Sequence, residues 1–284
     1  MIAITGASGQ LGRLTIEALL KRLSASEIIA LVRDPNKAGD LTARGILVRQ
    51  ADYNRPETLH RALIGVNRLM LISSSEVGQR TAQHRAVIDA AKQEGIELLA
   101  YTSLLHADKS VLGLATEHRD TEQALTESGI PHVLLRNGWY HENYTAGIPV
   151  ALVHGVLLGC AQDGLIASAA RADYAEAAAV VLTGENQAGR VYELAGEPAY
   201  TLTELAAEVT RQAGKTVVYS NLSESDYRSA LISAGLPDGF AALLADSDAG
   251  AAKGYLFDSS GDLRKLIGRP TTPMSEAIAA AIGR

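Results

Sequence analysis

Residues 1–20 read MIAITGASGQLGRLTIEALL, and they decide the class of fold. An apolar stretch of strand length is followed by Gly6, Gly9 and Gly12 at three-residue spacing, and a helical pattern begins directly after them. This order is typical of the phosphate-binding corner of a dinucleotide fold. Gly6 permits a turn with positive φ, Gly9 lets a pyrophosphate approach the backbone, and Gly12 lets the helix pack close to the sheet. The N–H groups at the start of the helix would then bind the anion.

Strands and helices alternate from residue 1 to residue 136. Buried-strand patterns follow the first one at residues 27–32, 45–52, 68–72, 96–101 and 132–136, and helical patterns separate them. Alternation of this kind indicates βαβ units and a parallel sheet. We therefore predict an α/β protein with a Rossmann-type doubly wound parallel sheet and a smaller C-terminal α/β lobe.

The end of the second strand indicates which dinucleotide binds. A carboxylate directly after this strand would hydrogen-bond both ribose hydroxyls and select NAD. Here the first residue is Arg33, and Lys37 follows one helical turn later. A guanidinium can form a fork to a 2′-phosphate, so we expect NADPH as the cofactor. Asp34 could turn toward the ribose, but Pro35 fixes a turn there, and the basic pair could also be a solvated helix start.

Residues beyond 140 predict a second, smaller lobe. Its expected strands are 156–159, 190–196 and 216–219, and its expected helices include 171–182, 224–234 and 239–245. No repeat or long linker separates the two parts. We expect an NADP-binding Rossmann domain over residues 1–140, with return segments from about residues 160–195. A mostly helical substrate lobe is expected over residues 141–284.

Three hydroxyl residues, Ser73, Ser74 and Ser75, follow the fourth strand of the predicted sheet. In this fold the end of that strand borders the nicotinamide half of the groove. Small hydroxyl side chains allow close approach there and can bind ribose or phosphate oxygens. Serines also occupy loops for turn chemistry alone. We expect the binding role.

Residues 137–144 read NGWYHENY and follow the sixth strand. They lie at the carboxyl edge, where open α/β sheets bind ligands. Aromatic rings with polar tips beside amides suit a flat, partly polar ligand. The alternative is an aromatic cluster that closes a core. We expect Tyr140, Asn143 and Tyr144 to bind the acceptor.

Composition excludes several classes of protein. The 284 residues carry a formal net charge of −6 and are 47% hydrophobic, which supports a sizeable core and gives no basic field for nucleic acid or anionic lipid. The single Cys160 excludes an internal disulfide, and no ligand spacing indicates zinc. No apolar stretch approaches the roughly 20 residues of a membrane span, and the first residues already form a strand rather than a signal peptide. We expect a soluble, cytoplasmic protein without a metal.

No tyrosine is followed four residues later by lysine, so the Tyr-x-x-x-Lys pair of many short-chain dehydrogenases is absent. Where the pair would stand, on the helix before the sixth strand, residues 117–120 read EHRD. His118 could relay a proton or could be an ordinary residue on the helix surface. Without general acid help, worth roughly 10²–10⁴-fold, an electron-poor acceptor such as a quinone is favoured over an ordinary ketone. No second glycine-rich loop indicates FAD, so hydride would pass directly from NADPH.

Several motifs, taken in order, resemble the NmrA-like atypical short-chain dehydrogenases. They are GASGQLG at 6–12, VRDP at 32–35, ISSS at 72–75, RNGWY at 136–140 with ENY at 142–144, and RADYA at 171–175. The likeness covers essentially the whole chain and is greatest to the bacterial NADPH:quinone oxidoreductases of that family.

The resemblance implies an NADP-binding Rossmann domain, a small C-terminal domain and a quinone bound in the cleft. It also implies a set of cofactor contacts: Gly6, Ala7, Ser8, Gly9, Gln10, Leu11, Arg33, Ser73, Ser74, Ser75, Asn137, Gly138, Trp139, Tyr140, His141 and Glu142. Asn143 becomes the catalytic residue on the substrate side.

Two other functions stay open. The first is a reductase of triarylmethane-type dyes or other xenobiotic acceptors, which would use the same cleft. The second is a non-catalytic NADP(H)-binding redox sensor, because some NmrA-like proteins work in this way. The aromatic and amide residues at 137–144 count against a sensor, which needs no stacking pocket beside the nicotinamide. Nothing in the sequence indicates the oligomeric state.

Overall fold

A computed structural model describes residues 1–283, and within them the predicted sheet is confirmed. It has seven strands in the order β3-β2-β1-β4-β5-β6-β8. The strands are β1 (Ile2–Ile4), β2 (Ile28–Val32), β3 (Leu47–Gln50), β4 (Arg68–Leu71), β5 (Leu98–Leu104), β6 (His132–Asn137) and β8 (Val191–Leu194). The pairs β1–β2, β1–β4, β2–β3, β4–β5 and β5–β6 are all parallel. All five residues of β2 are buried, as expected for a parallel strand covered on both faces.

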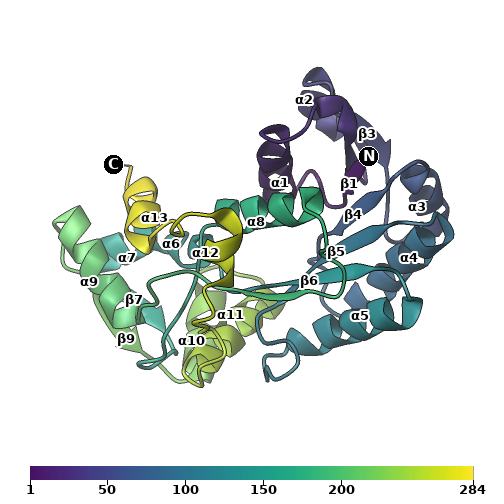
Figure 1. The fold of residues 1–284 in the computed structure, drawn as a ribbon. Helices are drawn as coiled ribbons and strands as arrows, with labels where there is room; N and C mark the ends of the chain where they lie inside the picture. The colour runs from purple at the N-terminus through teal and green to yellow at the C-terminus, as the bar shows by residue number, and fades with distance from the viewer. Residues whose placement is uncertain (284) are drawn as a thin grey trace. The chain divides into compact units, whose positions relative to one another are not determined.

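Helices cover both faces of this sheet (Figure 1). They are α1 (Gln10–Leu20), α2 (Gly39–Ala43), α3 (Pro56–Leu63), α4 (Arg80–Gln93), α5 (Ala115–Ser128) and α8 (Arg171–Thr183), with short 3₁₀ turns at Ala25–Glu27 and Pro35–Ala38. Helices α1 and α8 pack together on one face, and α3, α4 and α5 cover the other. The fold is therefore doubly wound.

The strand order reverses at β1, whose neighbours are β2 on one side and β4 on the other. In open α/β sheets ligands bind at the carboxyl ends of the strands beside such a switch point. Helix α1 starts there and lies very close to the preceding turn. A Cβ on Gly12 would stand 2.4 Å from the Gly6 carbonyl oxygen and 2.8 Å from the Ala7 Cα. Only glycine permits this approach, which is the packing role predicted for Gly12.

Contacts divide the chain into two compact units. The first comprises residues 1–107, 116–137 and 171–192, and the second comprises residues 108–115, 138–170 and 193–284. The second unit contains a parallel pair, β7 (Val156–Gly159) with β9 (Val218–Asn221). Its helices are α6 (His141–Thr145), α7 (Ile148–His154), α9 (Leu202–Ala213), α10 (Glu224–Ser233), α11 (Asp238–Ala251), α12 (Asp262–Ile267) and α13 (Met274–Ala281).

Helix α11 is longer than the predicted 239–245. It continues through the polar residues Asp246, Ser247 and Asp248 to Ala251. Ser247 donates its hydroxyl hydrogen to the Leu243 carbonyl one turn earlier at 2.8 Å, and the helix persists because Asp248 is buried with partners of its own. Tertiary burial thus overrides the local preference of these residues.

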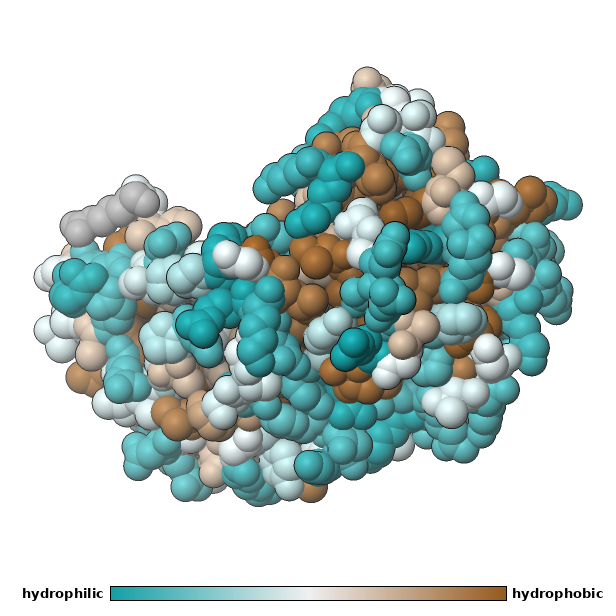
Figure 2. All heavy atoms as spheres, viewed as in Figure 1, coloured by the Kyte–Doolittle hydropathy of each residue, from teal (hydrophilic) through white to brown (hydrophobic). Residues whose placement is uncertain are grey.

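The surface of the chain mixes polar and apolar side chains. On the face in Figure 2, hydrophilic residues are interspersed with apolar ones. Over residues 1–283, no helix combines the length and the apolar character that crossing a membrane requires. The same residues contain no cluster of three or more His, Cys, Asp or Glu side chains that could hold a metal ion.

Candidate functional site

The glycine turn has the backbone geometry that anion binding requires. Gly6 adopts φ +57°, in the left-handed region that favours glycine. The Gly9 N–H donates to the Gly6 carbonyl at 2.9 Å, which closes the turn. Gly9 then caps α1 without a side-chain hydrogen bond. The N–H groups in the first turn of a helix have no intrahelical acceptor, so this end of α1 can donate to a phosphate.

Arg33 lies directly after β2 with three quarters of its side chain exposed. Its guanidinium forms an ion pair with Glu76, with 3.3 Å between Nη1 and Oε1. Asp34 does not compete for this space, because its carboxylate accepts from the Asn36 N–H at 3.1 Å and caps the 3₁₀ turn. The exposed side chain at this strand end is therefore that of Arg33, and its contact with a 2′-phosphate stays a prediction.

The serine loop, residues 73–75, is held mainly through its backbone. The Ser73 N–H donates to Thr102 Oγ1 at 2.8 Å. The Ser74 N–H donates to a histidine on α4, and the Ser74 hydroxyl accepts from the Glu76 N–H at 3.1 Å. Ser74 thus uses its side chain for the turn. In the part of the chain that the structure describes, the hydroxyls of Ser73 and Ser75 form no such bond and can bind a ligand.

Three predicted cofactor stretches meet at one edge of the sheet. The Ile72 N–H donates to Thr5 Oγ1 at 2.9 Å, which joins the ends of β1 and β4. A Cβ on Gly6 would lie 3.7 Å from the Ile72 Cβ. The Arg33–Glu76 ion pair then connects the end of β2 to the residue after the serine loop. The glycine turn, Arg33 and the serine loop therefore surround the switch point.

Asn137 ends β6 in the first unit, and its carbonyl accepts from the Leu105 N–H at 2.9 Å. The stretch after it, residues 138–144, belongs to the second unit. The Ala169 N–H donates to the Trp139 carbonyl at 3.1 Å, and the His141 N–H donates to the Ala169 carbonyl at 3.0 Å. Trp139 is buried. Residues 138–141 therefore have a firmly held backbone.

Both ring nitrogens of His141 have partners inside the second unit. Its Nε2 lies 2.8 Å from the Thr272 carbonyl oxygen, which can only accept, so Nε2 carries the proton. Its Nδ1 then accepts from Ser168 Oγ at 2.7 Å, and Ser168 lies 2.5 Å from the Tyr200 hydroxyl. The imidazole therefore anchors the start of α6, and the predicted contact of His141 with the cofactor stays a prediction.

The Tyr144 hydroxyl is also engaged in the interior of the second unit. It donates to Asp248 Oδ1 at 2.9 Å, and the Cys160 N–H donates to Asp248 Oδ2 at 3.1 Å. Burial raises the pKa of Asp248 to about 6, although both hydrogen bonds act in the opposite direction. By contrast, Tyr140, Glu142 and Asn143 are only partly buried. These three side chains are the more accessible ones in the predicted substrate segment.

A buried polar cluster in the first unit was not predicted. His118, which the sequence left as a relay or a helix-surface residue, is 5% exposed, so it is not on the surface. Its Nδ1 lies 2.7 Å from the hydroxyl of Tyr101, which is fully buried. Burial holds the pKa of His118 well below its usual value, with Arg80 and His84 adding to the effect. The sequence contains one signal for this cluster, which is helical spacing. On α4, Arg80 and His84 share a face with buried apolar residues.

Comparison with known proteins agrees with this geometry. Residues 6–185 match a family described as NAD(P)H-binding. Quinone oxidoreductase 2 of Escherichia coli (strain K12) is 62% identical over 278 residues, which are 98% of this chain and 97% of that protein.

Two crystal structures are similar over nearly the whole chain. The NADPH-dependent quinone oxidoreductase QOR2 of Escherichia coli, complexed with NADPH, has a TM-score of 0.97 and 61% identity, and covers 99% of this chain and 100% of that one. The triphenylmethane reductase of Citrobacter sp., complexed with NADP(H), has a TM-score of 0.96 and 38% identity, and the match covers 99% of this chain and 100% of that one.

Proposed function

The chain belongs to the NAD(P)H-binding, NmrA-like family, and we propose that it is an NADPH-dependent quinone reductase that passes hydride directly from NADPH to a quinone without flavin. One observation carries the proposal: the glycine turn, Arg33 and the serine loop lie together at the switch point of the sheet. The chain that holds them is 62% identical to the E. coli reductase.

Residues of the first unit would hold the cofactor by its charged groups. The turn from Gly6 to Leu11 offers backbone N–H groups and the start of α1 to the pyrophosphate. Arg33 offers a guanidinium fork to the 2′-phosphate. Ser73 and Ser75 offer free hydroxyls to the ribose and nicotinamide half. When bound, NADPH supplies the hydride.

Residues of the 138–144 segment would orient the acceptor. Asn143 and Tyr140 are partly buried and combine an amide with an aromatic ring, which suits a flat acceptor with polar oxygens. Tyr144 can contribute only its ring, because its hydroxyl donates to Asp248. Without a Tyr–Lys pair, the residues act by positioning, and an acceptor that tolerates late protonation fits this site.

A second candidate function is the reduction of cationic triarylmethane dyes. The observation that favours it is the likeness to the Citrobacter triphenylmethane reductase over nearly the whole chain. A dye and a quinone are both flat acceptors of hydride, so the same residues would serve either. The choice of acceptor separates the two functions.

The test follows the oxidation of NADPH optically, with a small benzoquinone as acceptor and with no flavin added. We expect turnover with NADPH and much less with NADH. A triarylmethane dye tested in parallel at equal concentration should be reduced more slowly than the quinone. Faster dye reduction would favour the second function, and tight NADPH binding without turnover of any acceptor would contradict both and leave a redox sensor.

A further inference from the structure

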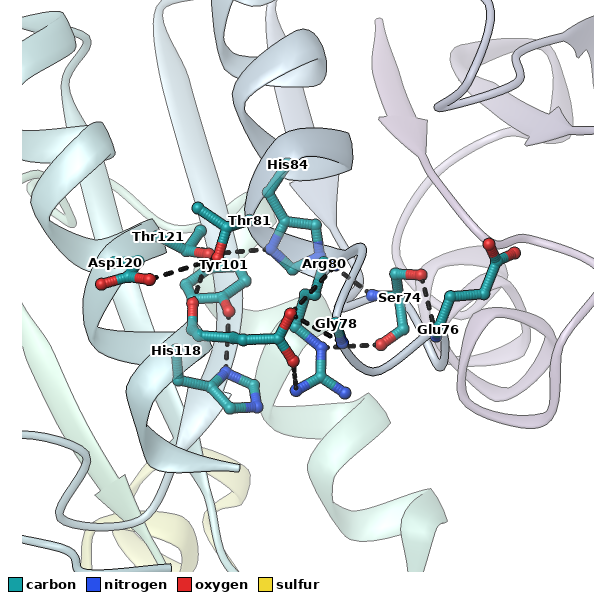
Figure 3. Close-up of polar contacts among 11 residues, drawn as sticks. Ser74, Glu76, Gly78, Arg80, Thr81, His84, Tyr101, His118, Asp120 and Thr121 are labelled. Carbon is teal, nitrogen blue, oxygen red and sulfur yellow. Dashed lines mark hydrogen bonds and ion pairs between the residues drawn. The ribbon is translucent and has the colours of Figure 1, made fainter. Parts of the chain in front are cut away.

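The serine loop is clamped by two side chains of α4 (Figure 3). His84 Nε2 accepts from the Ser74 N–H at 2.9 Å, and Arg80 Nε donates to the Ser74 carbonyl at 2.8 Å. Arg80 and His84 are four residues apart and therefore share one face of the helix. They satisfy both backbone groups of the same residue.

Hydrogen-bond chemistry sets the form of the His84 ring. A backbone N–H can only donate, so Nε2 must be an acceptor and the proton must reside on Nδ1. Nδ1 lies 2.9 Å from Thr121 Oγ1, and the Thr121 hydroxyl donates in turn to the Glu117 carbonyl at 2.8 Å. Each hydrogen along this chain has one acceptor. The imidazole is thus neutral and in a single tautomer.

His84 is enclosed by a cation, a second imidazole and two aromatic rings. Arg80 lies one turn away on α4, His118 approaches from α5, and Tyr101 packs edge-on from β5 at 5.4 Å between ring centres. Tyr53 makes a second edge contact at 6.3 Å. Burial and Arg80 lower the pKa of His84 to about 3. The ring therefore stays an acceptor throughout the neutral range.

Helix α5 holds the residues that connect the serine loop to α4. Glu117 Oε1 accepts from the N–H groups of both Gly78 and Arg80 at 3.1 Å, and its Oε2 lies 3.6 Å from Arg80 Nη1. Glu117 thus caps the start of α4 from a neighbouring helix. At the strand end, Thr102 holds Ser73. Side chains from three elements fix the loop, whereas two serine hydroxyls are left over.

We propose that His84 is a positioning residue for the cofactor site: its neutral ring holds the Ser74 backbone so that the hydroxyls of Ser73 and Ser75 stay available to NADPH. The inference rests on the proposed function, in which the serine loop binds the cofactor. A loop that is already ordered has no ordering cost to meet when the ligand binds. Loss of the clamp lowers the binding-competent fraction, and the apparent Kd rises by the same factor.

The first experiment compares three variants of the full chain. His84→Leu removes the acceptor, whereas His84→Gln places an amide oxygen where Nε2 was. His118→Leu is the matched control, because it removes another buried imidazole, which hydrogen-bonds Tyr101 rather than Ser74. The Kd of NADPH is measured by fluorescence titration without quinone, alongside the midpoint of thermal unfolding.

We expect His84→Leu to bind NADPH about tenfold more weakly, consistent with a buried donor left unpaired. His84→Gln should stay within about threefold of the wild type. His118→Leu should lower the unfolding midpoint but leave the Kd within about threefold. Unchanged affinity in His84→Leu, or equal losses in His84→Leu and His118→Leu, would overturn the proposal.

A second measurement does not depend on the variants folding well. In the wild-type protein labelled with ¹⁵N histidine, NMR should show the His84 proton on Nδ1 and a bare Nε2. Thr121→Val should disturb this signal, and Thr121→Ser should restore it. A proton on Nε2 would contradict the clamp.

Failure of the proposed function is distinguishable from failure of this inference. Absence of quinone turnover, with NADPH affinities as expected, would reject the reductase activity and leave the clamp supported. If the double variant Ser73→Ala and Ser75→Ala binds NADPH like the wild type, the serine hydroxyls are not contacts and the positioning role is wrong.

Discussion

The serine loop and the 138–144 segment are held in opposite ways. Small side chains cannot reach distant partners, so the serine loop depends on Thr102, Arg80 and His84 from neighbouring elements. The 138–144 segment contains large polar rings, and two of them serve as its own anchors. His141 binds Ser168 and Thr272, and Tyr144 binds Asp248.

This difference decides which predicted ligand residues act as structural anchors. In the serine loop the anchors come from outside, and the hydroxyls of the loop are left for a ligand. In the 138–144 segment the ring of His141 and the hydroxyl of Tyr144 serve as buried anchors, whereas Tyr140, Glu142 and Asn143 are only partly buried. The two regions also rely on buried ionisable groups of opposite kind, a neutral base in the first unit and an acid in the second.

The largest expected effect concerns His84 in acid. Its folded pKa of about 3 lies below the ordinary 6.5, so the unfolded chain binds a proton first as the pH falls. Stability from this group is complete above pH 6.5 and is lost as the pH falls toward 3, by roughly 4–5 kcal/mol in all. Urea unfolding at pH 7.5 and 4.5 should show roughly 3 kcal/mol of this loss.

The glutamine of His84→Gln cannot be protonated. Between pH 7.5 and pH 4.5 this variant should therefore lose roughly 3 kcal/mol less free energy of unfolding than the wild type. The control is His60→Gln, which makes the same replacement at a partly exposed histidine on α3. If His84→Gln and the wild type lose equal stability in acid, the ring is not held neutral.

Asp248 should act in the opposite direction. Its folded pKa of about 6 lies above the ordinary 3.8 because the carboxyl is buried. The folded state therefore binds the proton more readily, and this contribution is present below pH 3.8 and lost as the pH rises through 6. The loss amounts to roughly 3 kcal/mol by pH 8.

Asp248→Asn should remove this loss, so its stability should change less between pH 4 and pH 8 than that of the wild type. Asp246→Asn, two residues away on the same helix, is the matched control, and urea unfolding supplies the measurement. A wild-type pH dependence in Asp248→Asn would show that the buried carboxyl does not titrate in this range.

The sheet and the glycine turn were predictable because their signals are local. Apolar strands, glycine spacing and helical periodicity each lie within about twenty residues, and the structure places the predicted strands in a parallel sheet. The placement of Arg33 beside the loop after β4 also follows from strand order in this fold. The roles of these residues in binding stay predictions.

The anchors were not predictable in the same way. His84 was on a recognisable buried face of α4, but the sequence does not show that the Ser74 N–H points at it. The burial of His118 could not be predicted without knowing that Tyr101 faces it from β5. The end of α11 was predicted too early because the partners of Asp248, Tyr144 and Cys160, lie far away in the chain. Each case depends on contacts between distant elements.

Arg33→Ala tests the binding of a ligand beside the serine loop, where Arg33 pairs with Glu76. A charge-assisted bond to phosphate contributes about 1.5–3 kcal/mol. We therefore expect NADPH to bind about 10–100-fold more weakly, and NADH to change by less than about threefold. Arg44→Ala, which removes an exposed arginine paired with Glu17, is the control. Equal losses for NADPH and NADH would mean that Arg33 does not bind the 2′-phosphate.

Tyr144→Phe tests the region that uses its own rings as anchors, and its effect should be the smallest. Removing the hydroxyl leaves Asp248 with one partner fewer, which should lower the free energy of unfolding by about 1 kcal/mol. Because that hydroxyl is occupied, the KM for quinone should stay within about twofold. Asn143→Ala is the counterpart, with a lower kcat and an unchanged Kd for NADPH. A several-fold rise in the quinone KM of Tyr144→Phe, without loss of stability, would show that the hydroxyl leaves Asp248 to bind the substrate.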